Sequence, residues 1–292
     1  MKQVGHGIYY EDSFSGVTLG ALVYPQGIIA IDAPLRAEDA RTWRSMLINQ
    51  RGWPNRLLVN LDAHPDRTLG ARALESTILS HQKTAQVFQN RPTIFKGLST
   101  ESGATWESHT DTIGVRWAIP DITFSERMIL HLGGPDVILE HHPGCTPETI
   151  WVIIPQDRVV FVGDTVVIDQ PPFFATADLE PWLEQLDLLQ TTFRDYVIIS
   201  GRGGPVEKED IRSQQRIIEH VLKGMERLAR NNSPPEATEK LVQPILTKFF
   251  ASELHQQHHV QRLRYGLHQG YLRRYRSVPP IEPAPPETIE QP

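Results

Sequence analysis

Apolar residues follow two different periods along this chain. Short runs rich in Val, Ile, Leu and Phe, bounded by Gly, Pro or Asp, are typical of buried β-strands. Apolar residues that recur every three or four positions, as at Ala40, Trp43 and Leu47, are typical of amphipathic helices. The first pattern predicts strands at 17–24, 27–32, 56–60, 114–119, 122–124, 127–132, 136–141, 149–154, 158–163 and 195–200. The second predicts helices at 37–50, 71–88, 178–193, 207–229 and 236–276.

The order of these elements predicts an α/β fold. Two β-rich halves with helices around them favour a sandwich of two sheets whose outer faces are covered by helices. After residue 206 the pattern is helical, and the breaker NNSPP at 231–235 separates two blocks. The C-terminal residues are rich in proline. We therefore predict a sandwich domain at 1–206, a helical extension at 207–276 and a tail without fixed structure at 277–292.

Composition limits the class of protein. Apolar residues make up 39% of the 292 residues, which is enough for a large buried core and excludes global disorder. The net charge is −6, so general binding to nucleic acid or to a membrane surface is not expected. The single cysteine, Cys145, cannot form an internal disulfide, which favours a reducing compartment. Neither a signal-peptide pattern nor a membrane-spanning apolar stretch is present, so we expect a cytoplasmic protein.

Four loops that follow predicted strands are crowded with side chains that bind ligands. They are Asp62-Ala-His64-Pro-Asp66-Arg67, His142-Pro-Gly-Cys145-Thr146, Gly163-Asp164 and Gly201-Arg202-Gly203. Residues at strand ends on one edge of a sheet converge in space. The sequence therefore predicts that these four loops form one site.

The order and spacing of the four loops resemble the metallo-β-lactamase superfamily. Its signature is a strand ending in H-x-H-x-D-H, then a G-H-T loop, a strand ending in G-D and a G-H-G loop. The resemblance covers roughly residues 5–206 and includes the flanking segments IIAIDAP and RVVFVGDTV. It implies a four-layer αβ/βα sandwich, here with a helical C-terminal extension, and a metal-dependent hydrolase.

The departures from this signature affect the two metal positions differently. At the positions of the three histidines that hold the family's first metal, this chain has Asp62, His64 and Cys145. All three are ordinary zinc ligands, and Asp164 is the candidate fourth ligand. His142, three residues before Cys145, is an alternative to Asp62.

The second metal position carries two arginines. Arg67 and Arg202 stand where the family has histidines, and a guanidinium group has no lone pair to offer a metal. We therefore expect zinc or another divalent metal at no more than one ion per chain, with no ion at all as the open alternative. In either case the arginines could pair with Asp66 and Asp164 and replace the second metal.

Three functions follow from this motif. In a hydrolase with one ion, Asp66 orients or deprotonates the bound water, and Arg67 and Arg202 stabilise negative charge on the intermediate. In an inactive member, the same pocket serves a binding or structural role. A third hypothesis gives Cys145 a pKa lowered by the arginines and makes it a nucleophile with His64 as its base. The small-molecule substrate is not indicated.

The segment 254–276 combines histidines, arginines and tyrosines. His255, His258 and His259 share a helical face that could bind metal, although a solvated or partner-facing stripe is the simpler interpretation. The arginines and tyrosines favour an interface within the chain or between subunits over nucleic acid. A homo-oligomer formed through the C-terminal helices is therefore one expectation. The residues concerned are Arg262, Arg264, Arg273, Arg274, Arg276, Tyr265, Tyr271 and Tyr275.

Overall fold

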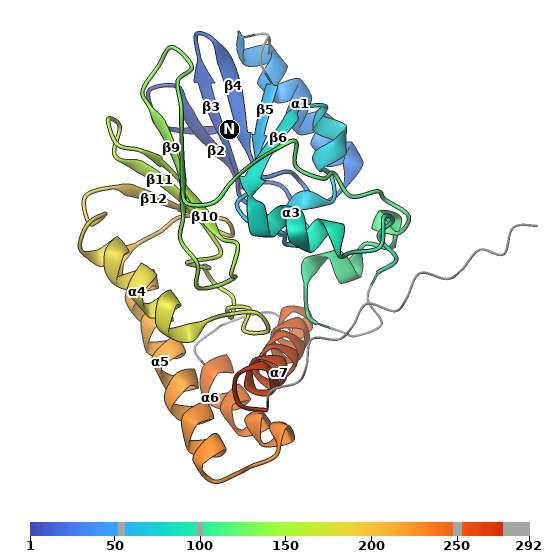
Figure 1. Cartoon of the computed structure of the whole chain (residues 1–292), viewed down its shortest axis with the longest axis vertical. Helices are drawn as coiled ribbons and strands as arrows, with labels where there is room; N and C mark the ends of the chain where they lie inside the picture. The colour runs from blue at the N-terminus through green and yellow to red at the C-terminus, as the bar shows by residue number, and fades with distance from the viewer. Residues whose placement is uncertain (52–55, 98–101, 248–252, 277–292) are drawn as a thin grey trace, which may run out of the picture.

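Two β-sheets form the centre of the protein (Figure 1). The computed structural model describes residues 1–51, 56–97, 102–247 and 253–276. The seven-stranded sheet has the order β1 (Lys2–Gly5), β2 (Ile8–Glu11), β3 (Leu19–Tyr24), β4 (Gly27–Ile31), β5 (Arg56–Val59), β6 (Thr77–His81) and β7 (Ile122–Phe124). The six-stranded sheet has the order β13 (Gly204–Pro205), β12 (Val197–Ser200), β11 (Val159–Gly163), β10 (Ile150–Ile154), β9 (Val137–His141) and β8 (Arg127–Leu130).

The side chains of the central strands are divided between two apolar layers, one on each face of the sheet. Along β10, Ile150, Val152 and Ile154 enter the core between the sheets. Trp151 and Ile153 point to the opposite face, where they contact helices. Because successive side chains of a strand point to opposite faces, two apolar layers require a continuous apolar run.

Helices cover both outer faces, which confirms the predicted αβ/βα sandwich with C-terminal helices. On the seven-stranded sheet, α1 (Ala37–Arg51) buries Trp43 and Leu47 against the strands. On the six-stranded sheet, α4 (Leu179–Gln190) and α5 (Lys208–Arg230) cover the outer face. Figure 1 shows these helices on opposite sides of the two sheets.

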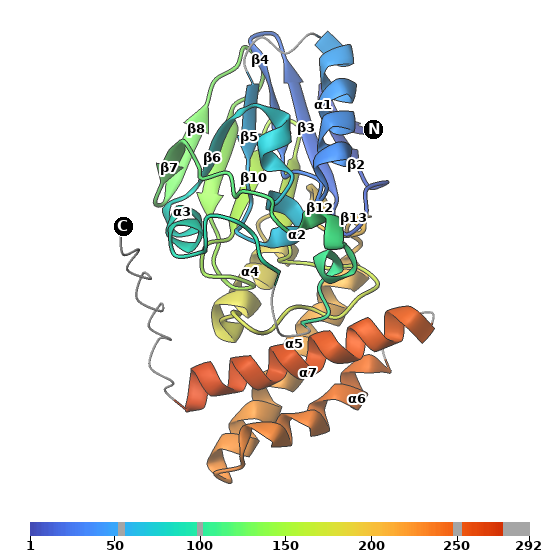
Figure 2. The ribbon, with the colours of Figure 1, turned by 90° about the vertical axis from the view of Figure 1, so that its right-hand side faces the viewer.

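The C-terminal helices lie beneath one end of the sandwich. They are η4 (Pro235–Leu241), α6 (Val242–Leu246) and α7 (Glu253–Tyr275), and Figure 2 shows α7 crossing below the loops of both sheets. Leu241, Ile245 and Leu263 share one hydrophobic cluster with α4 and α5. The predicted domain boundary near residue 206 stays a prediction, and the predicted tail at 277–292 lies outside the described residues.

Small residues on α7 permit its close contact with the 173–175 loop. A Cβ on Gly266 would lie 3.0 Å from the backbone nitrogen of Phe174, and one on Gly270 would lie 2.8 Å from its carbonyl oxygen. A larger side chain at Gly270 would therefore push the helix away. This contact matters for function because the same loop forms part of the pocket described below.

The prediction of one helix at 71–88 is wrong in its first half. Residues Ala71–Leu74 form a 3₁₀ turn, Thr77–His81 form strand β6, and only Gln82–Gln89 form a helix, α3. The apolar residues of a strand buried on both faces do not alternate, so their spacing was mistaken for a helical period. Asp178 is the N-cap residue of α4, but its side chain does not cap the helix and contacts Arg273 instead.

Candidate functional site

The predicted loops converge at one end of the sandwich, at the ends of strands from both sheets. The first follows β5 and enters the short helix α2 (Pro65–Thr68). Proline at the first helical position and the His64 ring, which accepts a hydrogen bond from the Asp66 N–H, favour this turn. The loops after β11 and β12 contribute Asp164 and Arg202.

Arg202 joins three of the predicted site residues. Its Nε lies 3.0 and 3.1 Å from the two carboxylate oxygens of Asp164. Its Nη1 donates hydrogen bonds to Asp66 Oδ2 at 3.0 Å and to the Gly16 carbonyl at 2.8 Å. Its Nη2 lies 3.2 Å from His64 Nδ1. The side chain is 1% exposed, so these contacts replace nearly all of its hydration.

Arg67 makes a second set of contacts deeper in the fold. Its Nη2 donates to Asp164, and its Nη1 lies 3.5 Å from Asp62 Oδ2 and 3.4 Å from Asp32 Oδ2. The Arg67 side chain is fully buried. The sequence interpretation did not assign Asp32 to the site, although it lies in the IIAIDAP segment that carried the resemblance.

Six residues thus form one buried arginine–carboxylate network. Two guanidinium groups face four carboxylates, and each arginine contacts Asp164. The oxygens not bound by arginine also find donors: Asp32 Oδ1 accepts from Leu61 N, and Asp66 Oδ1 accepts from Trp106 N. The members are Asp32, Asp62, Asp66, Arg67, Asp164 and Arg202.

The network controls the protonation of its members. Burial alone would raise the pKa of Asp164 and Asp66, but the neighbouring arginines hold both pKa values below the usual range. Asp32 is the exception, because burial outweighs Arg67 and raises its pKa to about 7. Burial also lowers the pKa of His64 to about 4, so its imidazole is neutral at pH 7.

Cys145 lies apart from the arginines' hydrogen bonds. Its Sγ is buried and lies 3.2 Å from Thr149 Oγ1. Burial raises the pKa of the thiol to about 12, and the effect of Arg67 on it is small. The expectation of a lowered pKa is therefore wrong, because desolvation outweighs the attraction of a distant guanidinium.

The arrangement does not fit a metal ion as it stands. Both oxygens of Asp164 accept hydrogen bonds from arginine, and His64 Nδ1 faces donors from Asp66 and Arg202. Across the described part of the chain, no group of three His, Cys, Asp or Glu residues could hold an ion. Asp62 Oδ2 is a buried oxygen without a hydrogen bond. The set Asp62, His64, Cys145 and Asp164 remains a prediction.

A cavity of about 330 Å³ opens beside the network, and we call it the site pocket. His64, Cys145 and Asp164 reach it from the motif loops. Its remaining walls come from α3, the 102–106 and 173–176 loops, α4 and α7. Much of the lining is apolar or aromatic: Ala63, Pro65, Val87, Ala104, Trp106, Pro147, Phe173, Phe174, Ala175 and Trp182.

Three charged residues of the site pocket were not assigned to it from the sequence. They are Arg91, Glu148 and Arg262. Arg262 was singled out as an interface residue and does make contacts within the chain, to Gly103, Gln170 and Pro171. Arg91 and Glu148 carry no local motif, and only tertiary structure brings them to the motif loops.

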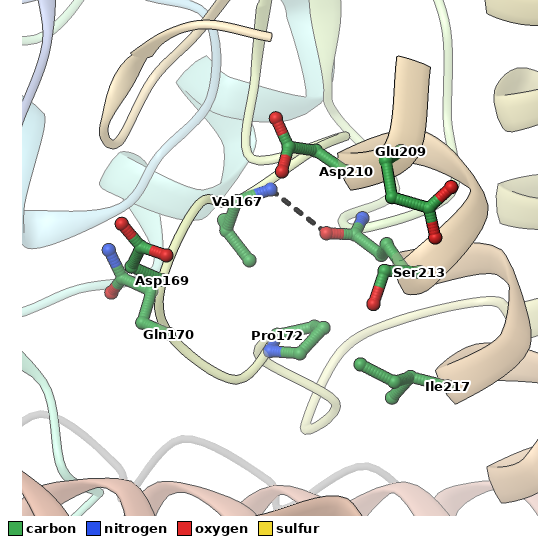
Figure 3. A pocket seen from close by; sticks show the side chains of 9 residues that line it. Val167, Asp169, Gln170, Pro172, Glu209, Asp210, Ser213 and Ile217 are labelled. Atoms are coloured by element: carbon green, nitrogen blue, oxygen red, sulfur yellow. Dashed lines mark hydrogen bonds between the residues drawn. The ribbon is translucent and has the colours of Figure 1, made fainter. Parts of the chain in front are cut away.

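A second cavity of about 220 Å³ lies behind the Asp164 loop and is shown in Figure 3. There the Val167 N–H donates to the Gln214 side chain. Two of its acidic residues have partners within or at the start of α5: Glu209 contacts Arg216, and Asp210 accepts a hydrogen bond from the Glu207 N–H. The Val167–Gln214 hydrogen bond joins the loop that carries Asp164 to α5.

Comparison with known proteins agrees with this architecture. Residues 63–201 match the family model of the metallo-beta-lactamase superfamily. The matched part of the sandwich is thus similar in sequence to the metallo-β-lactamase superfamily. A search of curated proteins finds no match. No helix of the described residues is both long and apolar enough to cross a membrane.

Solved structures share the fold at low sequence identity. The sec-alkylsulfatase Pisa1 from Pseudomonas sp. is 14% identical with a TM-score of 0.63, over 93% of this chain and 49% of the enzyme. This chain thus spans about half the alkylsulfatase. A metallo-beta-lactamase from Pontibacter korlensis is 15% identical with a TM-score of 0.56, over 75% of this chain and 97% of that one. The predicted sandwich, residues 1–206, makes up 71% of the 292 residues. Because the alkylsulfatase match covers 93% of this chain, it also includes C-terminal helices.

Proposed function

We propose that this protein binds a small molecule in the site pocket without a bound metal ion. In this proposal the arginine–carboxylate network takes the place of the second metal. The observation that carries it is the position of Arg202, whose guanidinium contacts both Asp66 and Asp164. These are the two aspartates that the family resemblance assigns to that metal.

Electrostatics supports the substitution. A second dication would have to occupy the space between Asp66 and Asp164, where a buried guanidinium group already lies. A dication and a guanidinium group held between the same two carboxylates would repel each other strongly in a poorly hydrated site. The arginine also meets both carboxylates with directed hydrogen bonds, so neither carboxylate needs a metal to compensate its charge.

A hydrolase with a single ion is the second candidate. Its support is the buried Asp62 Oδ2, which has no hydrogen bond, together with His64 and Cys145 at the same pocket. Binding an ion there would require the Cys145 thiol to lose its proton, and burial opposes this by raising its pKa to about 12.

Thermal melts with and without metal test the proposal. We expect the melting temperature of the wild-type protein to change neither with EDTA nor with added zinc. Arg67→His/Arg202→His should be less stable without zinc and should recover with it, because an ion then supplies the missing positive charge. A wild-type protein that EDTA destabilises would contradict the proposal. If Cys145→Ala abolished that sensitivity, the single-ion hydrolase would be supported instead.

A further inference from the structure

Two arginines of the site pocket differ from those of the network. Arg91 and Arg262 both line the pocket, yet within the described residues no carboxylate oxygen lies within 4.0 Å of either guanidinium group. Arg67 and Arg202, by contrast, share four carboxylates. A cation in a poorly hydrated place without a nearby anion is costly, so these two groups favour a negatively charged partner.

Arg262 contributes charge but few free donors. It is 4% exposed, and its hydrogen bonds go to neutral acceptors, the Gly103 and Pro171 carbonyls and the Gln170 side chain. Its guanidinium lies 4.0 Å from the centre of the Phe173 ring. Burial, with repulsion from Arg202, lowers its pKa to about 9. The charge is therefore poorly compensated by the protein.

Arg91 contributes directed donors. Its Nη1 donates to the Ala63 carbonyl at 2.9 Å, which fixes the guanidinium beside the loop that carries His64. The Trp117 ring lies 4.5 Å from the guanidinium carbon and holds it further. A guanidinium group has five N–H bonds, and among the described residues only Nη1 has an acceptor. The remaining donors are held in place and available to a ligand.

The rest of the pocket favours an apolar body on that ligand. Phe173, Phe174 and Trp182 contribute aromatic surface. Glu148, 8% exposed, is an acid in the same wall, and burial raises its pKa. Because Glu148 and Asp164 offset the arginines, the pocket is not strongly positive, and recognition depends on the directed donors of Arg91.

We propose that the site pocket binds an organic anion, whose oxyanion group accepts hydrogen bonds from Arg91 and whose apolar body contacts Phe173, Phe174 and Trp182. This inference rests on the proposed function, because it requires the pocket to act without a metal. The cavity of about 330 Å³ sets the size of the ligand.

Calorimetric titration of the full chain in EDTA tests the proposal. The probe is 4-phenylbutyrate, with 4-phenylbutanamide as the neutral compound of the same shape and acetate as the anion without a body. We expect the phenylbutyrate to bind at least about tenfold more tightly than either control compound, because charge-assisted hydrogen bonds contribute more than neutral ones. Equal affinity of the carboxylate and the amide would overturn the proposal.

Variants of the pocket make the test specific. Arg91→Gln should weaken phenylbutyrate binding about tenfold or more, and Arg91→Lys should retain most of it. Glu148→Gln should strengthen binding, because it removes a repelling charge. Arg194→Gln, at a side chain 70% exposed, is the matched control and should change nothing. Thermal melts of all four variants establish that they are folded. Unchanged affinity in folded Arg91→Gln would overturn the proposal.

Two failures remain distinguishable. If neither phenylbutyrate nor the amide binds while melts stay insensitive to EDTA, the anion inference fails and the proposed function stands. If phenylbutyrate binds only after zinc replaces EDTA, a metal ion and not Arg91 binds the anion, and both proposals fail.

Discussion

Replacing Arg202 by alanine removes the side chain on which the arginine–carboxylate network most depends. Arg202→Ala deletes the contacts to Asp66, Asp164, His64 and the Gly16 carbonyl, and it leaves Asp66 without an arginine. Asp164 retains only Arg67. Breaking a buried ion pair by removing one partner costs about 3–5 kcal/mol. At about 2–4 °C per kcal/mol, the melting temperature should fall by roughly 10 °C.

Urea unfolding followed by tryptophan fluorescence measures this cost. The control is Arg216→Ala, which breaks the exposed pair with Glu209 and should cost about 0–1 kcal/mol. The difference between wild type and Arg202→Ala should shrink as pH falls toward about 4 and below it. Without the arginine, Asp66 and Asp164 take up protons at higher pH, and this removes the unpaired negative charge.

A small effect would refute this reasoning. If Arg202→Ala unfolds at the same urea concentration as Arg216→Ala, the buried contacts of Arg202 contribute no more than a surface pair. The guanidinium would then occupy this position without compensating the carboxylates.

Two further predictions concern other parts of the chain. His81 accepts from the Lys83 N–H, lies 2.6 Å from the Ser125 carbonyl and stacks on His141, and burial lowers its pKa to about 4. The contribution of the neutral imidazole to stability is therefore complete above the unfolded pKa of about 6.5 and is lost as pH falls toward 4. The unfolding free energy of His81→Asn should depend less on pH in that range than the unfolding free energy of the wild type. Identical pH profiles of the two proteins would contradict this. Deletion of residues 231–292 removes Leu241, Ile245 and Leu263 from the hydrophobic cluster that they share with α4 and α5. We expect the truncated chain to bind more of a dye that detects exposed apolar surface and to aggregate on gel filtration. A truncated chain that stays soluble and unchanged in assembly would refute this prediction.

Local patterns were sufficient to predict much of the fold. Strands such as β10 and β11 are apolar throughout because both faces are covered, and α5 begins and ends within a residue of its predicted range. The error at Thr77–His81 arose because a parallel strand inside a sheet has no alternating pattern that separates it from a helix.

The site could be predicted only where a motif marked it. The spacing of Asp66, Arg67, Asp164 and Arg202 indicated that they would meet, and the ion pairs among them agree with that expectation. Arg91 could not be predicted, because its role depends on the contact with Ala63, 28 residues away. The raised pKa of Cys145 was missed for a similar reason: burial is a property of the folded chain.

Elemental analysis of protein purified without chelator tests the central claim most directly, namely that arginines have replaced the second metal. The account predicts clearly less than one equivalent of zinc or any other divalent metal per chain, and no increase after dialysis against zinc. One tightly bound equivalent would contradict binding without a metal ion. Two tightly bound equivalents, with Arg67 and Arg202 intact, would show that the arginines move aside for metal and would contradict their replacement of the second metal.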